Sequence, residues 1–196
     1  MYNNINRNFE ILDAQLLPGS YKNFSGAKGP YNQYGQRKFN LIVNSPSSIY
    51  KLDGLTSVVE NQEDEYGNVR SVVTIDGKPI QEYMNEKGWN VKPTKPRDPE
   101  DPITYFVEIN VAFNNENYSD PDVRRYTNTS AVKLTGETVG ILDSDEILKA
   151  DLVIRPRYSL NDMGGTRIKG YLREGRFTVY ESEIAQRYTD LDKNIQ

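Results

Sequence analysis

The sequence predicts a mainly β protein, built as a five-stranded Greek-key barrel with short helices and an inserted β-hairpin arm. Five or more segments alternate apolar and polar residues with the period of two that a half-buried strand requires. A long loop rich in aromatic residues follows the first strand, and a short helix precedes a basic hairpin, as a small Greek-key barrel allows. The chain also contains 14 tyrosines, a residue type that favours sheets.

Composition excludes several classes of function. The chain has 196 residues and neither cysteine nor histidine, so thiolate zinc sites, cysteine nucleophiles, disulfides and Ser-His-Asp catalysis are excluded. No stretch approaches the roughly 20 apolar residues of a membrane span, and the amino terminus has no apolar run. We therefore expect no membrane partner and a cytoplasmic location, with one domain over residues 1–190 and a flexible tail over 190–196.

The first strand is expected over residues 8–17, where Pro18-Gly19 ends it, and the next over residues 37–43. The loop between them, residues 20–38, contains four basic residues, four aromatic residues and no acid. Basic side chains that track phosphates and rings that stack on bases are what a groove for a single nucleic-acid strand requires. A surface loop tied down by its tyrosines is an equally good interpretation.

The inserted hairpin arm is expected over about residues 45–78, because β-branched runs flank an acidic segment and a turn at Gly67. Pro79 and Gly88 then mark the start and the end of a short helix. A proline-rich connector follows over residues 93–99.

Two further strands are expected in the second half of the chain, a clear one over residues 105–113 and a weaker one over 123–133. A short helix is expected to begin at Asp143, with Glu146 three positions later as in a capping box. A last helix is expected to open at Glu181, because acids in its first turn suit the helix dipole.

The segment 149–180 is predicted to form the basic hairpin around which the fold is organised. Four residues of its first strand are expected to face the core: Leu152, Ile154, Tyr158 and Leu160. The opposite face of the hairpin collects five basic residues and one tyrosine: Arg155, Arg157, Arg167, Lys169, Tyr171 and Arg173. A change of phase near Gly175, where a bulge is expected, then turns Phe177 and Val179 inward.

Charge is concentrated in this hairpin. Residues 149–176 contain seven basic and three acidic residues, a difference of 7 − 3 = +4 in a chain whose net charge is −4. Because like charges on paired strands destabilise a sheet, this face indicates an anionic partner. The alternative is a solvated hairpin whose cations pair with acids from elsewhere, such as the run Glu63-Asp64-Glu65.

The chain offers little for catalysis. Asp76-Gly77-Lys78 resembles half of a restriction-type nuclease site, but no Pro-Asp pair precedes it, and Pro121-Asp122 lies downstream in the wrong order. There is no Walker loop and no GxGxxG motif. We therefore expect a binding protein and not an enzyme, with no cofactor and no metal.

Several short motifs resemble bacteriophage proteins that bind single-stranded DNA. They are Arg7-Asn8-Phe9, Lys22-Asn23-Phe24-Ser25-Gly26, Arg37-Lys38-Phe39-Asn40, Gly88-Trp89-Asn90-Val91-Lys92, Lys95-Pro96-Arg97, residues 150–155 and Gly170-Tyr171-Leu172. The resemblance implies an oligonucleotide/oligosaccharide-binding (OB) barrel, single-stranded DNA as the partner, and phage replication or recombination proteins as further partners. Residues 190–196 depart from it, because they match poorly the acidic tip with which such proteins recruit partners.

The residues and the resemblance together predict non-sequence-specific binding and protection of single-stranded DNA in phage DNA replication or recombination. The candidate binding residues are basic, to follow phosphates, or aromatic, to stack on bases: Lys22, Lys28, Tyr31, Tyr34, Lys38, Trp89, Arg155, Arg157, Arg167, Lys169, Tyr171 and Arg173. Trp89 has an alternative role as a core residue that caps the short helix. The alternative function is a phage β protein that binds another protein, either a virion component or an inhibitor of a host nucleic-acid enzyme.

Overall fold

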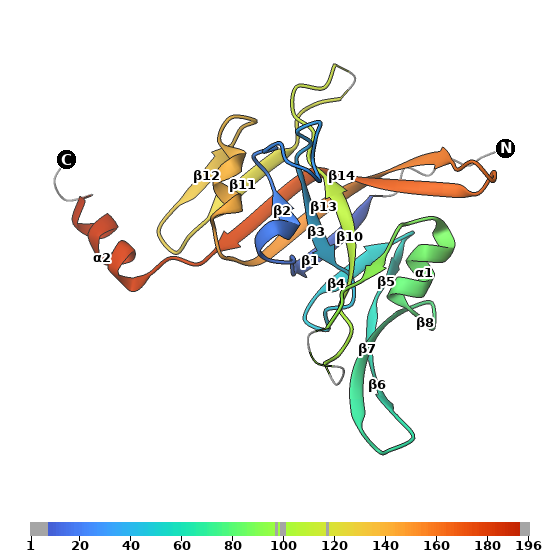
Figure 1. The fold of residues 1–196 in the computed structure, drawn as a ribbon. Helices are drawn as coiled ribbons and strands as arrows, with labels where there is room; N and C mark the ends of the chain where they lie inside the picture. The colour runs from blue at the N-terminus through green and yellow to red at the C-terminus, as the bar shows by residue number, and fades with distance from the viewer. Residues whose placement is uncertain (1–7, 97, 99–100, 117, 193–196) are drawn as a thin grey trace.

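The computed structural model describes residues 8–96, 98, 101–116 and 118–192. Over these residues the protein is mainly β, with an eleven-stranded sheet and a three-stranded sheet (Figure 1). The part described contains no helix that is long and apolar enough to cross a membrane. Arg7 and Arg97 of the motifs above, and residues 193–196 of the expected tail, lie outside it.

The elements are short except in the second half of the chain. The strands of the larger sheet are β1 Phe9–Ala14, β2 Lys22–Asn23, β3 Lys38–Ile42, β4 Ile49–Leu52, β5 Leu55–Thr56, β9 Lys92–Pro93, β10 Tyr105–Asn110, β11 Asp122–Tyr126, β12 Ala131–Leu134, β13 Ile147–Leu160 and β14 Thr166–Val179. The smaller sheet contains β6 Val58–Glu63, β7 Val69–Ile75 and β8 Lys78–Pro79. The helices are α1 Ile80–Lys87, α2 Glu183–Asp192 and two 3-10 helices, Gly19–Tyr21 and Val139–Asp143. Because α2 continues to Asp192, the first residues of the expected tail are helical.

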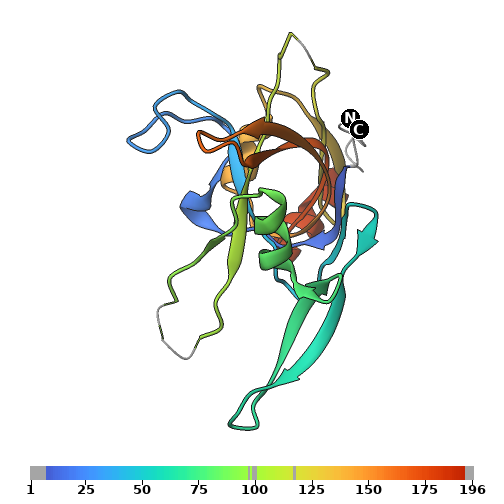
Figure 2. The same ribbon diagram turned by 90° about the vertical axis from the view of Figure 1, so that its right-hand side faces the viewer.

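The larger sheet runs in the order β2-β3-β10-β14-β13-β1-β4-β5. Most neighbours are antiparallel, whereas β10 and β11 both pair with β14 in parallel. β13 and β14 form a hairpin of two 14-residue strands that extends from one side of the sheet (Figure 1). Viewed from that side, the strands of the larger sheet curve around a common centre (Figure 2).

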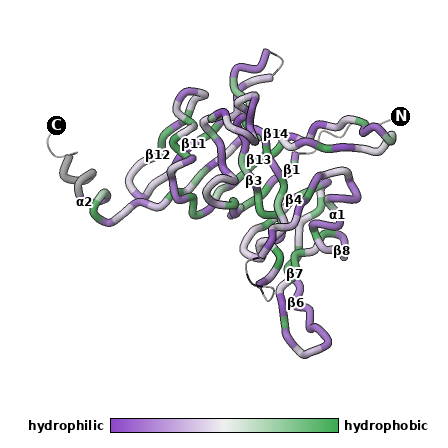
Figure 3. The backbone as a smooth tube through the Cα atoms, in the orientation of Figure 1, coloured by the Kyte–Doolittle hydropathy of each residue, from purple (hydrophilic) through white to green (hydrophobic). Residues whose placement is uncertain are grey.

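Aromatic rings fill the middle of the core. The Phe24 ring centroid lies 5.2 Å from that of Phe39 and 5.4 Å from that of Phe177, and all three side chains are fully buried. Since Phe24 lies in the loop between β2 and β3, the core anchors that loop. Hydrophobic segments gather along the central strands, whereas the tip of the β6–β7 hairpin is hydrophilic (Figure 3).

The two ends of the β13–β14 hairpin lie in different environments. Leu152 and Ile154 are buried as predicted, but Tyr158 and Leu160 are 51% and 72% exposed, so the prediction that these two face the core is wrong. The described part of β1 pairs with β13 only as far as Ile154. Beyond that residue the hairpin extends past β1, so Tyr158 and Leu160 are exposed, whereas Ile168 of β14, the partner of Tyr158, stays buried beside Trp89.

The predicted change of phase in β14 is confirmed. A register shift opposite Val153 and Ile154 leaves Arg173 as an extra residue in β14. Before this bulge the buried residues of β14 have even numbers, as at Ile168 and Leu172. After it they have odd numbers, as at Phe177, which is fully buried. A Cβ atom at Gly175 would lie 2.5 Å from that ring, so glycine is required there.

The hairpin of β6 and β7, residues 58–75, is called the arm below. It is shorter than predicted, because β4 and β5 fall inside the range 45–78 and yet belong to the larger sheet. Every residue of β6 is exposed, and the arm projects away from the larger sheet (Figures 1 and 2).

The predicted short helix is confirmed as α1, with Gly88 at its end. The φ angle of Gly88 is 105°, in the left-handed region that favours glycine. A Cβ atom there would also lie 2.4 Å from the carbonyl oxygen of Thr166. Glycine therefore both ends the helix and lets it approach the start of β14.

Two elements differ from the prediction. The helix expected to begin at Asp143 is a 3-10 helix that ends there. The Asp143 carboxylate accepts hydrogen bonds from the backbone N–H groups of Phe24 and Ser25 at 2.5 and 2.9 Å, so a tertiary contact takes the place of a helix cap. The weak strand expected over residues 123–133 is a hairpin of two strands, β11 and β12.

Candidate nucleic-acid interface

Four polar residues form a row across four adjacent strands of the larger sheet. Lys38 of β3 pairs with Asn110 of β10, Asn110 pairs with Tyr171 of β14, and Tyr171 pairs with Arg155 of β13. Paired residues project from the same face of a sheet. Sequence neighbours of the four are buried on the other face: Phe39, Ile109, Gly170 and Ile154. We call the outward set the polar row.

The basic residues of the hairpin extend the polar row along β13 and β14. The hairpin register puts Arg157 opposite Lys169, two residues from the row. Arg167 follows on the same face of β14, and Arg173 stands at the register shift. The structure thus gathers the predicted set, which we call the basic hairpin face: Arg155, Arg157, Arg167, Lys169, Tyr171 and Arg173.

Carboxylates do not neutralise this face. Among the described residues, its five cations form no ion pair, whereas Lys149 pairs with Asp13 at 2.5 Å and Arg176 with Asp122 at 2.8 Å. The acidic run 63–65, which the sequence suggested as an alternative partner, lies in the arm instead. The positive charges of the basic hairpin face therefore repel one another, and an anionic partner would reduce this repulsion.

A cavity of about 550 Å³ opens at the root of the basic hairpin face. It is lined by Asn8, Tyr118, Arg155, Pro156, Arg157, Tyr158 and Arg173. The guanidinium carbon of Arg157 lies 3.7 Å from the ring centroid of Tyr118 and 4.2 Å from that of Tyr171. These cation–π contacts hold the Arg157 side chain in one place.

Amide side chains, not tyrosines, hold the outer part of the loop between β2 and β3. Asn32 Nδ2 donates hydrogen bonds of 2.9 Å to the carbonyl oxygens of Ala27 and Gln36, and Asn32 Oδ1 accepts one of 3.0 Å from Gln36 N. Tyr31 and Tyr34 remain 97% and 86% exposed. The interpretation that the tyrosines tie down the loop is therefore wrong for these two, whose rings are free to stack.

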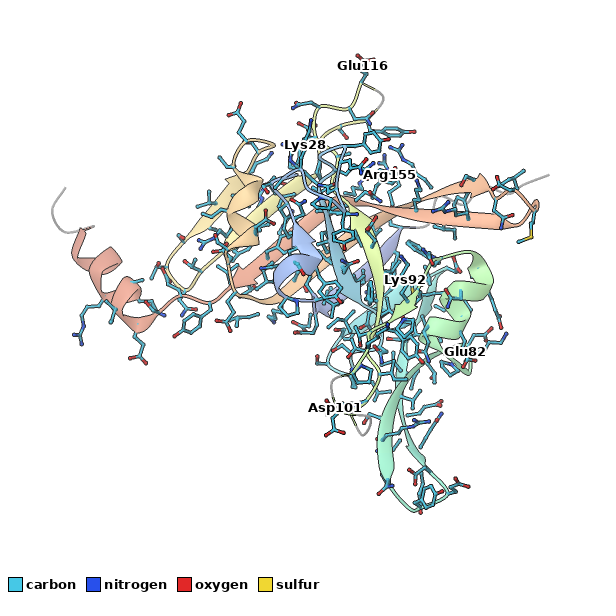
Figure 4. All side chains as sticks on the ribbon, viewed as in Figure 1. Lys28, Glu82, Lys92, Asp101, Glu116 and Arg155 are labelled. Carbon is cyan, nitrogen blue, oxygen red and sulfur yellow. The ribbon has the colours of Figure 1, made fainter. Side chains whose placement is uncertain are left out.

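Lys28 and Lys38 supply charge on the loop side of the polar row. Lys28 is exposed, and Figure 4 shows it on the same upper side of the molecule as Arg155. Lys38 forms an ion pair of 2.9 Å with Glu108. A cavity of about 300 Å³ between the loop and β3 has Tyr31, Lys38 and Glu108 among its walls, so the loop and the polar row border one hollow.

Two of the predicted binding residues, Trp89 and Lys22, lie away from this surface, so the prediction that they contribute to it is wrong. Trp89 is 4% exposed, and its ring packs edge-on against Phe9 at 5.6 Å, which fits its alternative role in the core. Lys22 Nζ donates to the carbonyl oxygens of Leu142 and Asp145 at 3.0 and 2.6 Å. Burial lowers the pKa of the Lys22 ammonium, against the opposing charges of nearby carboxylates. Its role is to fasten the loop to the 3-10 helix.

Asn110 and Tyr118 belong to the surface and were not predicted from the sequence. Asn110 Nδ2 donates to the carbonyl oxygen of Gly170 at 3.2 Å and so ties β10 to β14. Tyr118 lies in a polar connection without periodicity, and its contacts with Arg155 and Arg157 place it at the surface. The Asp76-Gly77-Lys78 segment, in contrast, is a turn at the foot of the arm, where Lys78 pairs with Glu86 at 2.6 Å.

Comparison with known protein families gives a match. A family model described as "Putative phage ssDNA-binding domain" matches residues 56–195. Neither the curated proteins nor the solved structures yield a match. The matched range includes β10, β13 and β14, and thus three of the four strands of the polar row.

Proposed function

This chain belongs to the family of phage single-stranded DNA-binding domains, and we propose that it binds single-stranded DNA without sequence preference. Its proposed role is to protect single strands during phage DNA replication or recombination in the host cytoplasm, together with the phage proteins that act there. The role requires binding alone and no catalytic step.

The observation that carries this proposal is the polar row, because it joins two regions that are distant in sequence. The strand is proposed to enter beside Tyr31 and Tyr34, to cross Lys38 and Asn110, and to continue over the basic hairpin face. Arginine and lysine follow phosphates whatever the base, and tyrosine rings stack on any base. Such a surface favours single strands of every sequence.

We also propose that the larger sheet forms an OB-type barrel. Residues 15–17, just after β1, contact β3: Leu17 N donates to Asn40 O, and Ile42 N to Gln15 O, both at 2.9 Å, and Leu16 bridges Leu41. This contact supports the proposal, because it would lead the pairing path β1-β3-β10-β14-β13 back to the segment that follows β1. In OB-type barrels the second and third strands and two flanking loops bind oligonucleotides. Here β3 and β10 occupy that position, and the flanking segments are the β2–β3 loop and the end of the β13–β14 hairpin.

The test is titration of a fluorescently labelled oligo-dT at several salt concentrations. We expect saturable binding that weakens steeply with salt, with a slope of log affinity against log salt of roughly −0.7 for each phosphate neutralised. Oligomers of other sequences should bind within a few-fold of oligo-dT. No saturable binding at low salt would reject the proposal and favour the alternative, in which the basic hairpin face meets an acidic protein surface.

A further inference from the structure

The cavity of about 550 Å³ differs in charge from the rest of the proposed path. Among the described residues that line it, three of seven are arginines and none is a carboxylate. In the smaller cavity beside the loop, Lys38 is instead neutralised by Glu108. The charge gathered at the larger cavity exceeds what one internal phosphodiester, with its single negative charge, would balance.

Arg157 is prepared for a ligand in this cavity. The two tyrosine rings at 3.7 and 4.2 Å fix its guanidinium, and its Nε is buried without a hydrogen-bond partner. A guanidinium that is already fixed loses little further freedom on binding, and its planar fork can donate two parallel hydrogen bonds to a phosphate. A lysine in the same place would keep the charge and lose the fork.

The cavity also lies where the basic part of the path ends. β13 is the last strand of the polar row, and its outer neighbour is β1. Residues 8–14 contain no lysine or arginine, and Glu10 is exposed on β1. On this side Glu10 stands opposite the exposed Lys51 of β4, so beyond the three arginines the surface is no longer uniformly basic. This suits a strand end better than a strand that continues.

We propose that this cavity binds the terminal phosphate monoester of a DNA strand, so that the protein prefers single strands that carry a phosphate at one end. The proposal rests on the proposed function, because it uses the polar row as the DNA path. A phosphate monoester carries nearly two negative charges near neutral pH and three terminal oxygens, and three guanidinium groups match both. The 5′ and 3′ phosphates share this chemistry, so the experiment separates them.

The experiment measures the affinity of four labelled oligo-dT ligands: one with a 5′ phosphate, one with a 3′ phosphate, one with neither, and one without a terminal phosphate but longer by a nucleotide. We expect one phosphorylated ligand alone to bind roughly tenfold more tightly than the unphosphorylated one. The longer ligand, which has an extra internal phosphate, should not. Equal affinities for all four, or equal gains from both ends, would overturn the proposal, whereas loss of binding to the unphosphorylated ligand would overturn the proposed function.

Variants separate the fork of Arg157 from charge alone. Arg157→Lys should remove the preference for the phosphorylated end, measured as a ratio of two affinities of the same variant, while Arg167→Lys near the hairpin tip should keep it. If Arg157→Lys does not fold, Arg173→Lys at the exposed side of the cavity takes its place and should reduce the same ratio. A ratio that survives both cavity substitutions would show that the preference arises elsewhere.

The preference should also depend on pH through the ligand. The second pKa of a phosphate monoester is about 6, so its second charge is present at pH 7.5 and mostly absent at pH 5. The sequence contains no histidine, and the described lining residues of the cavity include no carboxylate. Burial raises the pKa of Tyr158, and the charge of Asp53 adds to the shift. The ratio should therefore fall between pH 7.5 and pH 5, and an unchanged ratio would contradict recognition of a dianion.

Discussion

Two long hairpins project from the body of the protein, and their side chains carry opposite net charge. The β13–β14 hairpin carries the basic hairpin face, with five cations that form no ion pair among the described residues. The arm, residues 58–75, contains one basic and four acidic residues, a difference of 1 − 4 = −3. Both are antiparallel ribbons (Figure 1), so backbone geometry alone does not decide which one binds DNA.

The two hairpins also differ in how they are anchored. A Cβ atom at Gly170 of β14 would lie 3.0 Å from the Trp89 ring, and Ile168 N donates to the carbonyl oxygen of Gly88 at 2.8 Å. In the arm only one strand is packed: every residue of β6 is exposed, whereas Val73, Thr74 and Ile75 at the end of β7 are buried. In the β13–β14 hairpin both strands contribute buried residues at the root, so its charged side chains are held in place for a ligand more firmly than those of the arm.

The largest effect is expected from removing that anchor. Trp89→Ala should lower the free energy of unfolding by about 3–5 kcal/mol, because it leaves a cavity beneath the hairpin root. Val59→Ala in the arm should change it by less than about 0.5 kcal/mol, since that side chain is largely exposed. Chemical denaturation of both variants checks the comparison, and equal losses would contradict it.

The same burial predicts that Trp89 emission is not quenched when oligo-dT is added to the wild-type protein. If bound DNA quenched this emission, Trp89 would contact DNA and would not be the buried anchor of the hairpin.

The next effect concerns the sign of charge. Arg167→Glu combined with Lys169→Glu should weaken binding of single-stranded DNA by at least about 2 kcal/mol for every sequence, because contacts to charged groups are lost and repulsion is added. The matched change in the arm, Glu63→Lys with Glu65→Lys, should strengthen binding by less than about 0.5 kcal/mol, since exposed charges more than a Debye length away are screened. Anisotropy titrations measure both, and equal and opposite shifts would show that only net charge matters.

Aromatic residues give a smaller contrast between the two hairpins. Tyr171→Ala should cost about 1–3 kcal/mol of binding free energy, the value of one stacked base. Tyr66→Ala in the arm should leave the affinity unchanged, although Tyr66 is 81% exposed. Isothermal titration with oligo-dT distinguishes them, and a silent Tyr171→Ala would mean that the hairpin binds by charge alone.

The smallest effect is a pH response confined to one turn. Asp64 accepts hydrogen bonds from Tyr66 N, Asn68 N and Asn68 Nδ2 at 2.9, 2.9 and 3.0 Å, and bonds from Asn68, the largest cause, lower the pKa of its carboxyl. Because this pKa is lower in the folded state than in the unfolded state, the ionised carboxylate stabilises the turn at pH values above the unfolded pKa of about 3.9. This stabilisation is lost as the pH falls through the folded pKa. The protection of amides in the arm turn, measured as exchange relative to the intrinsic rate at each pH, should therefore fall below about pH 4.

The turn of the β13–β14 hairpin provides the control for this response. It is held by Asn161 Oδ1, which accepts hydrogen bonds from Met163 N and Gly165 N at 3.1 and 2.7 Å. An amide side chain does not titrate in this range, so exchange there should show no such step. Asp64→Asn should abolish the step in the arm, and a step that persists in this variant would assign it to another group.

Much of the hairpin could be predicted from the sequence, because period-two alternation is a local property of a strand. The shared face of Arg155, Arg157 and Lys169, the change of phase beside Gly175, and the turn between the strands all depend on residues a few positions apart. The same holds for α1, which ends at a glycine as its sequence indicates.

Local patterns could not predict where burial ends or which strands become neighbours. Tyr158 continues the apolar alternation of β13, but the described pairing of β13 with β1 ends at Ile154, before the strand reaches Tyr158, which is exposed. Lys22 and Trp89 are residue types that bind DNA, but their tertiary contacts give them other roles. Lys22 donates a hydrogen bond to the 3-10 helix that contains Leu142, and Trp89 is buried in the core.

The sequence by itself determined that one ribbon of this protein is basic, alternating and sheet-forming. Only the tertiary structure decided that Lys38, Asn110, Tyr171 and Arg155 stand in one row, and that Tyr118 contacts Arg157. The physical reason is that pairing between β3, β10 and β14 joins residues from 171 − 110 = 61 to 110 − 38 = 72 positions apart. Such pairing depends on how all the strands pack together, which no short segment encodes.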